Sequence, residues 1–362
     1  MTDKEAYVAF NLTGKVGAVT LESLVASYGS VSEAWRQYPG KISRLGGEVD
    51  WEAEFRKAKA YGVEILTPAD EAYPERLRSV RGHPLALYVK GDAARLSDPQ
   101  IAMVGTRRAT AYGLGVANRL SYDLAKAGWA IVSGLALGID AEAHRGALGA
   151  KGVTIGVLGS ALDEFFPNEN RDLAKEIVAS GGCVVSEFPF GRNADKTTFP
   201  IRNRTVAALS MGVVAVESPL KSGTLITTSI ALEMGRTVMA IPGGVDRRMS
   251  AGCLKLIREG ARLVRHADDV MEEMAEFGRL LRPPAKPDAG ETAGDGGRLP
   301  AYSAEEAMVM LHVDEEGVGL DEIARRTGLA PMKVSSIAVM LRIKGFVRFL
   351  PGNRISLLTS PK

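Results

Sequence analysis

The segment from Lys196 to Arg204 places cations beside an aromatic ring. It reads Lys-Thr-Thr-Phe-Pro-Ile-Arg-Asn-Arg, with Phe199 between the lysine and the two arginines. Arginine presents a planar fork of donors to phosphate oxygens, and lysine presents a flexible positive charge. An aromatic ring gives a nucleobase a surface on which to stack. These residue types predict a site for single-stranded nucleic acid at Lys196, Phe199, Arg202 and Arg204.

Short turns rich in small residues provide a second set of candidates. Each follows an apolar run: Gly105-Thr106-Arg107-Arg108, Ser133-Gly134, Gly159-Ser160 and Ser222-Gly223-Thr224. Small residues let the backbone approach a ligand closely, and the N-terminus of the next helix supplies unpaired N–H groups. If these turns lie at one edge of a sheet, they form an anion site with Arg107 and Arg108 beside it.

A structural interpretation of the same residues stays open. Phe199 could belong to the core, and the arginines could pair with acidic residues at the sheet edge such as Glu187 and Glu217. Arg202 and Arg204 also lie on different faces of the expected helix, so one of them could be structural.

The elements that must position these residues begin at about residue 85. Helix-length stretches over 115–127, 140–150 and 169–180 separate runs that are apolar throughout: Ile101–Val104, Ala130–Val132, Val153–Leu158, Cys183–Val185, Val213–Val216 and Thr237–Ile241. Continuously apolar strands are buried on both faces, which indicates a parallel sheet covered by helices on each side. The alternation predicts an α/β fold, a Rossmann-like, doubly wound and mostly parallel sheet whose ligands bind at the carboxyl ends of the strands.

Residues 1–66 are expected to form a small all-α domain. Gly14 and Gly17 separate two short stretches with helical spacing, a pattern typical of SAM or helix-hairpin-helix units. Backbone amides at such a hairpin can meet a phosphate, but a packing module without a ligand fits the pattern equally. The α/β domain is expected over 67–281.

The C-terminal part is expected to be a tethered module. Residues 282–300 are rich in Pro, Gly and polar residues, which predicts a flexible linker. Residues 301–362 contain three helical stretches and a hairpin around 351–353, the arrangement of a winged helix. With only Lys333 as an early cation on the expected recognition helix, partner binding or weak DNA binding is favoured over sequence-specific readout.

The overall composition is that of a folded protein. Its net charge is small, so a site for nucleic acid requires basic residues concentrated in one part of the chain. The 362 residues are 46% hydrophobic and 24% charged, and the formal net charge is only +2. Two cysteines without ligand-like spacing argue against a zinc site and favour a reducing compartment. Neither a signal peptide nor a membrane span is expected, which predicts a cytoplasmic protein that does not associate with a membrane. Without G-x-G-x-x-G or a P-loop, no cofactor is expected.

A series of motifs resembles one family. In the family's order the chain carries Val104-Gly-Thr-Arg-Arg-Ala-Thr-Ala-Tyr-Gly113, Ser133-Gly-Leu-Ala-Leu-Gly-Ile-Asp-Ala-Glu-Ala-His144, Phe199-Pro-Ile-Arg-Asn-Arg204, Ser222-Gly-Thr-Leu-Ile-Thr227, Ile241-Pro-Gly243 and Gly260-Ala261. Upstream, Tyr73-Pro74 and Pro84–Gly91 also match. Over residues 70–265 the sequence is similar to the DprA (Smf) family. One position departs, because Leu254 stands where the family has asparagine.

The resemblance implies a non-enzymatic protein that binds single-stranded DNA, self-associates as a homodimer and loads RecA onto the strand in natural transformation. The DNA-binding positions it implies are Gly105, Thr106, Arg107, Ser133, Gly134, Lys196, Phe199, Arg202, Asn203 and Arg204. No catalytic residue and no metal are implied.

Two competing interpretations remain. A nucleotide-processing hydrolase of the lysine-decarboxylase-like type also uses glycine-rich strand ends, but Gly244 leads into Val-Asp-Arg-Arg and not into the P-G-G-x-G-T-x-x-E run of that group. For such chemistry Glu217 is the best candidate. Asp140 and His144, four apart on a helix, could form an acid–base pair, but an aspartate at the helix N-terminus and a structural histidine are favoured. The winged helix also allows a transcription regulator.

Overall fold

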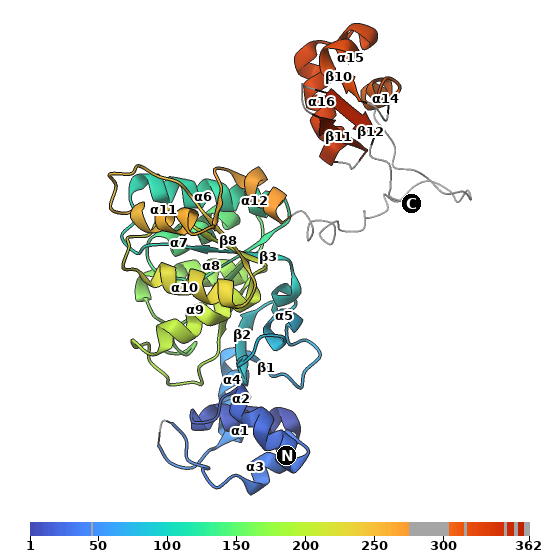
Figure 1. The fold of residues 1–362 in the computed structure, drawn as a ribbon. Coiled ribbons are helices and arrows are strands. Elements are labelled where there is room, and N and C mark those ends of the chain that lie inside the picture. Colours follow the sequence, from blue (N-terminus) through green and yellow to red (C-terminus); the bar gives the residue numbers. More distant parts are fainter. Residues whose placement is uncertain (45, 275–303, 315–316, 344–345, 351–353, 358–362) are drawn as a thin grey trace, which may run out of the picture. The chain divides into compact units, whose positions relative to one another are not determined.

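The structure consists of two compact units. The computed structural model describes residues 1–44, 46–274, 304–314, 317–343, 346–350 and 354–357. The chain divides at residue 285 into an N-terminal unit and a C-terminal unit, which are described separately (Figure 1). The linker predicted over 282–300 lies outside the described residues.

The N-terminal unit starts with four helices: α1 (Asp3–Thr13), α2 (Ala18–Tyr28), α3 (Val31–Gln37) and α4 (Trp51–Tyr61). A capping box starts α1, in which Thr2 Oγ1 accepts from the Glu5 amide at 3.3 Å and Glu5 accepts from the Thr2 amide at 2.6 Å. Gly14 ends α1 in the left-handed region at φ 62°. These helices enclose a small core in which the rings of Phe10 and Trp35 meet edge to face at 5.0 Å.

A nine-stranded sheet forms the body of this unit. Its spatial order is β1-β2-β6-β5-β4-β3-β7-β8-β9. Strand β2 pairs antiparallel with its neighbours β1 and β6, and all other neighbouring strands pair in parallel. The strands are β1 (Glu64–Leu66), β2 (Leu87–Gly91), β3 (Gln100–Val104), β4 (Ala130–Ser133), β5 (Thr154–Val157), β6 (Cys183–Ser186), β7 (Gly212–Ala215), β8 (Thr237–Ala240) and β9 (Arg262–Leu263).

Helices cover both faces of the sheet. One face packs against α6 (Ala111–Lys126), α7 (Ile139–Gly149), α8 (Arg171–Ala179) and α12 (Ala267–Glu273). The other packs against α5 (Glu75–Arg78), α9 (Thr198–Leu209), α10 (Gly223–Glu233) and α11 (Ala251–Arg258). Alternate residues of each strand therefore enter different cores: Ala102 and Val104 of β3 face α9, whereas Ile101 and Met103 face α6. Two short 3-10 helices, Ala93–Ser97 and Asn168–Asn170, complete the unit.

The predicted fold class is confirmed. All six predicted strands are present, each within one residue of the predicted ends. Strands β1, β2 and β9 were not among the predicted strands. β1 and β9 are only three and two residues long at the two edges of the sheet, and β2 is apolar only over its first three residues and ends in an exposed lysine and glycine.

The N-terminal helices rest on the edge of the sheet. Val8 and Leu12 of α1 share a core with Ala58 of α4, Ile65 of β1 and Tyr88 of β2. The strand β1 belongs to the sheet, although its residues fall inside the range 1–66 predicted for the helical domain. Whether the helical part is a domain of its own, with the boundary at 66, stays a prediction.

The C-terminal unit is a winged helix. It contains α14 (Ala304–Met310), β10 (Val318–Gly319), α15 (Leu320–Thr327), α16 (Pro331–Ile343), β11 (Val347–Leu350) and β12 (Arg354–Leu357). The strand β12 pairs antiparallel with both β10 and β11. Val309, Ile323, Val334 and Leu341 form the centre of its separate core.

Both cysteines lie in the N-terminal unit as buried free thiols. Burial raises the pKa of Cys183 to about 12 and that of Cys253 to about 12. Within the ranges that the structure describes, no helix combines the length and apolar character needed to cross a bilayer.

Candidate nucleic-acid interface

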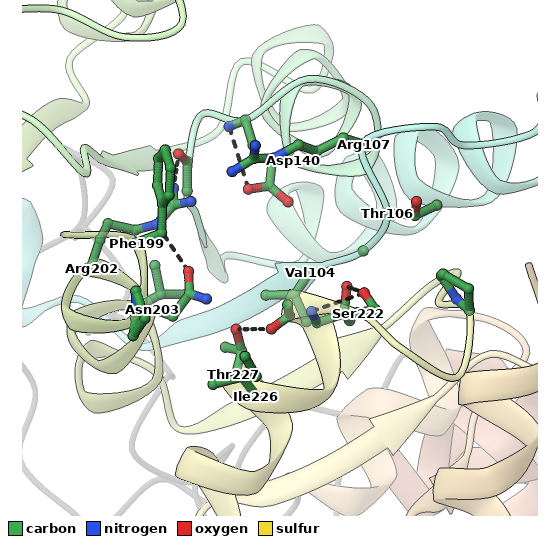
Figure 2. Close-up of a pocket in the computed structure, with 18 of the residues that line it drawn as sticks. Val104, Thr106, Arg107, Asp140, Phe199, Arg202, Asn203, Ser222, Ile226 and Thr227 are labelled. Atoms are coloured by element: carbon green, nitrogen blue, oxygen red, sulfur yellow. Dashed lines mark hydrogen bonds between the residues drawn. The ribbon is translucent and has the colours of Figure 1, made fainter. Parts of the chain in front are cut away.

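A pocket opens where the strand order reverses. The chain moves outward from β3 through β4 and β5 to β6, and then returns to place β7 on the other side of β3. Ligands of doubly wound sheets bind at such a switch point, outside the carboxyl ends of the strands. A cavity of about 500 Å³ lies there, lined by the turns after β3 and β4 and by the first turns of α9 and α10 (Figure 2).

The turn after β3 forms one wall. The Thr106 amide donates to the Glu217 carbonyl at 2.8 Å, which fixes the turn to the end of β7. Arg107 is exposed, and its guanidinium carbon lies 4.8 Å from the centre of the Phe199 ring. Gly105 is required for packing, because a Cβ at this position would collide with Ile139 of α7.

The first turns of α9 form the opposite wall. Lys196 is exposed just before the helix, and Phe199 and Asn203 are half-buried one turn apart. Figure 2 shows Phe199 and Asn203 facing the pocket from α9, with Arg107 and Asp140 across from them. The start of the helix is held by Asp195, which accepts from the amides of Thr197 and Thr198 at 2.7 and 3.1 Å.

Arg202 lines the pocket but lies below its surface. Only 5% of this residue is exposed. Its guanidinium donates to the carbonyls of Gly134 and Val157, and its Nε donates to Asn203 Oδ1 at 3.0 Å. It lies beside the buried Asp140, where burial raises the pKa of the carboxyl and the positive charge of Arg202 opposes that rise. Arg202 therefore ties α9 to the ends of β4 and β5.

Ser133 and Gly134 support this arrangement from β4. The Ser133 hydroxyl is fully buried and donates to the Met103 carbonyl at 2.6 Å. A Cβ at Gly134 would collide with the Arg202 guanidinium. The space left by this glycine is occupied by an arginine of the same chain.

Arg204 lies outside the pocket. It points toward the loop before β2, where its guanidinium donates to the Arg81 carbonyl. The structure thus brings together Gly105, Thr106, Arg107, Gly134, Lys196, Phe199, Arg202 and Asn203 at one cavity, and places Ser133 behind it and Arg204 on the opposite side of α9.

The turn before α10, which contains the candidate segment Ser222-Gly223-Thr224, also lines the pocket, although it was not among the DNA-binding positions that the resemblance implies. Lys221, Ser222, Gly223 and Thr224 all line the pocket, and the Ser222 hydroxyl caps α10 by accepting from the Thr224 amide at 3.1 Å. The structure therefore places this small-residue turn at the same cavity as the turns after β3 and β4, as the sequence pattern predicts. Among the lining residues five are cationic and one, Asp140, is acidic, which favours an anionic ligand.

The residues considered for catalysis, and Glu187 as a possible partner of the arginines, make structural contacts. Glu217 accepts from the amide and hydroxyl of Thr110 at 2.9 and 2.7 Å and thereby holds the start of α6. His144 is fully buried and its Nδ1 lies 2.7 Å from the Thr154 hydroxyl, so it does not face Asp140 as an acid–base partner. Glu187 accepts from the Thr205 hydroxyl at 2.7 Å. No cluster of His, Cys, Asp and Glu suited to a metal ion occurs in the described part of the chain.

Fold and pocket together define a Rossmann-like α/β protein with a cationic, aromatic-lined site at the switch point of its sheet. Residues 64–275 match the family model described as DNA recombination-mediator protein A, and residues 283–353 match that of the DprA winged helix domain. The chain belongs to the DNA recombination-mediator protein A, or DprA (Smf), family.

Relatives support the match over nearly the whole chain. Protein Smf of Synechocystis is 31% identical over 98% of both chains. The X-ray structure of DNA processing protein A from Streptococcus pneumoniae superimposes with a TM-score of 0.63 at 31% identity, covering 75% of this chain and 98% of that one. A structure of DNA processing protein A from Helicobacter pylori, described for its single-stranded DNA binding mode, gives a TM-score of 0.54 at 30% identity over 59% and 96%.

Proposed function

We propose that this protein binds single-stranded DNA at the switch-point pocket and acts as a recombination mediator, making and breaking no covalent bond. The observation that carries the proposal is the presence of Arg107, Lys196 and Lys221 in one pocket with an aromatic ring, Phe199, in a chain of this family. The Helicobacter pylori relative is described as binding single-stranded DNA, which supports the same ligand here.

The wall residues divide into two roles. Arg107, Lys196 and Lys221 contact phosphates, together with amides at the start of α10 and the Thr106 hydroxyl. Phe199 stacks on a base, and Asn203 lies beside it. Ser133, Gly134 and Arg202 position these walls from below, and Arg204 fixes the far side of α9. Phosphate contacts and stacking carry little sequence information, so binding is largely sequence-tolerant.

The wider role follows from the family. In this proposal the protein works in the cytoplasm as a homodimer, protects an incoming single strand and presents it to RecA during natural transformation. The winged helix serves partner binding or weak DNA binding. Sequence-specific control of transcription is the less favoured role, because Lys333 is the one cation in the first turn of α16.

Fluorescence anisotropy of a labelled oligothymidine across a salt series tests the site. We expect tight binding that weakens with salt, with a slope near −0.7 per phosphate contacted, and weaker binding of a duplex of equal length. Replacing Arg107 by Ala removes one phosphate contact and one cation–π contact. Affinity should therefore fall about tenfold, and the slope of log affinity against log salt should become shallower by about 0.7, the value for one phosphate contact.

Arg119→Ala is the matched control. Arg119 is exposed on α6 outside the pocket, so its loss changes the net charge equally without touching the site. Equal effects of the two substitutions, or equal affinity of the wild-type protein for duplex and single strand, would refute the proposed site.

A further inference from the structure

A second aromatic ring lies next to the pocket and has no role in the site described so far. Phe166, in the loop between β5 and α8, is 46% exposed. Its ring centre lies 6.2 Å from that of Phe199, with the two planes inclined at 45°. Of the phenylalanines whose side chains the structure describes, Phe166 is the most exposed.

The two rings differ in how much of their surface is free. Phe199 is half-buried, because the Arg107 guanidinium lies over its ring and Gly159 lies against its edge. A Cβ at Gly159 would stand 3.1 Å from Phe199 Cδ1, so this glycine provides the room in which the ring sits. Phe166 consequently offers the larger free aromatic surface of the pair. Exposing this apolar surface to water costs free energy, so burying it under a ligand is favourable.

The loop that carries Phe166 is held in place on both sides. Asn170 is buried and donates to the carbonyls of Leu135 and Ala136 at 2.8 and 3.1 Å. On the other side, Asp163 accepts from the Gly191 amide at 3.0 Å. The neighbouring Phe165 is buried under the Arg171 guanidinium, 5.5 Å from its ring centre. A ring on so restrained a loop is preorganised, and little entropy is lost when a ligand packs on it.

We propose that Phe166 and Phe199 form a two-ring platform that takes two successive bases of a single strand, which extends the DNA path from the pocket to the loop after β5. This inference rests on the proposed function. The two ring planes are inclined at 45°, so bases lying parallel to each ring cannot be parallel to one another as stacked bases of a duplex are. Bases on the tilted rings are therefore unstacked from each other, and the platform selects for single strands.

The test uses the full-length protein and two probes of equal length and charge, oligothymidine and the same strand with abasic sites in place of its bases. Phe166→Ala should weaken oligothymidine binding about tenfold, or about 1.4 kcal/mol, and leave abasic-strand binding unchanged. Tyr28→Ala, which removes an aromatic ring that is 44% exposed on α2, serves as the control and should affect neither probe. Phe166→Trp should retain affinity, and its added indole emission should be quenched when oligothymidine binds.

The outcomes separate the two proposals. Wild-type affinity of Phe166→Ala for oligothymidine, with Arg107→Ala still weakened, would overturn the platform and leave the pocket intact. Equal losses on the oligothymidine and abasic strands would show a structural effect and also overturn the platform. Unquenched emission from the Phe166→Trp protein when oligothymidine is bound would also overturn the platform, because no base would then lie against the ring. Failure of the wild-type protein to bind oligothymidine would overturn the proposed function itself.

Discussion

Several residues that the sequence predicts to contact a ligand instead contact other residues of the protein. Gly134 and Gly105 were expected to let a ligand approach, but their missing side chains make room for Arg202 and Ile139. Arg202 itself donates to two carbonyls that end β4 and β5. Sequence shows that a cation and a glycine belong to one site. It does not show that they belong to each other, because side-chain burial depends on packing between distant segments.

His144 should make the protein sensitive to acid. Burial lowers the pKa of its imidazole from 6.5 to about 3, so the folded protein keeps it neutral while the unfolded chain takes up a proton below pH 6.5. The unfolded state then binds more protons, and the free energy of unfolding falls as the pH drops through this window, by about 1.4 kcal/mol per pH unit. Above pH 6.5 this contribution is fully present.

Urea unfolding of the wild-type protein and of His144→Gln from pH 4 to pH 8 measures the effect. Other titrating groups, including Glu187, whose pKa burial raises to about 7, contribute to both proteins and cancel in the difference. The difference in unfolding free energy between the two proteins should be constant above pH 6.5. Below pH 6.5 the wild type should lose stability steadily relative to His144→Gln. A difference independent of pH would contradict the assignment of a buried neutral histidine.

At the scale of elements, the sequence predicts the centre of the sheet better than its edges. Strands such as β3 and β7 are recognisable because both faces are buried, which makes them apolar throughout. The carboxyl ends of neighbouring parallel strands lie at the same edge of the sheet. The positions of the motifs after these strands therefore predict most of the residues that line the pocket. The ring of Phe166 was missed, because its place depends on loop conformation and not on periodicity.

The start of α6 depends on Glu217 from β7. Replacing Glu217 by Ala leaves the Thr110 amide and hydroxyl without their buried acceptor, at a cost of about 1–3 kcal/mol in unfolding free energy. Urea denaturation detects this as a lower midpoint. Glu233→Ala, at an exposed position in the last turn of α10, is the control and should remain within about 0.5 kcal/mol of wild type. Equal stability of the two variants would mean that the carboxylate is not needed for the fold.

At the scale of the molecule, the pocket and both rings lie within the N-terminal unit, and the winged helix has a core of its own. A chain truncated after residue 285 should therefore fold and keep its affinity for oligothymidine to within about threefold, with an unchanged salt slope, since no phosphate-contacting residue of the pocket is lost. Anisotropy titrations of the truncated and full-length proteins give the comparison. A large loss of affinity or a shallower slope in the truncated chain would assign a substantial share of the binding to the C-terminal unit.

The two buried thiols have a practical consequence. With pKa values near 12 and no access to solvent, Cys183 and Cys253 are slow to react with maleimides or iodoacetamides at neutral pH. A cysteine placed on the surface, for example at Arg119, would then be the single reactive position on a chain that needs no prior removal of its native cysteines. Site-specific dyes or spin labels can be attached to the unaltered scaffold, and strand capture can be followed by energy transfer from one molecule at a time.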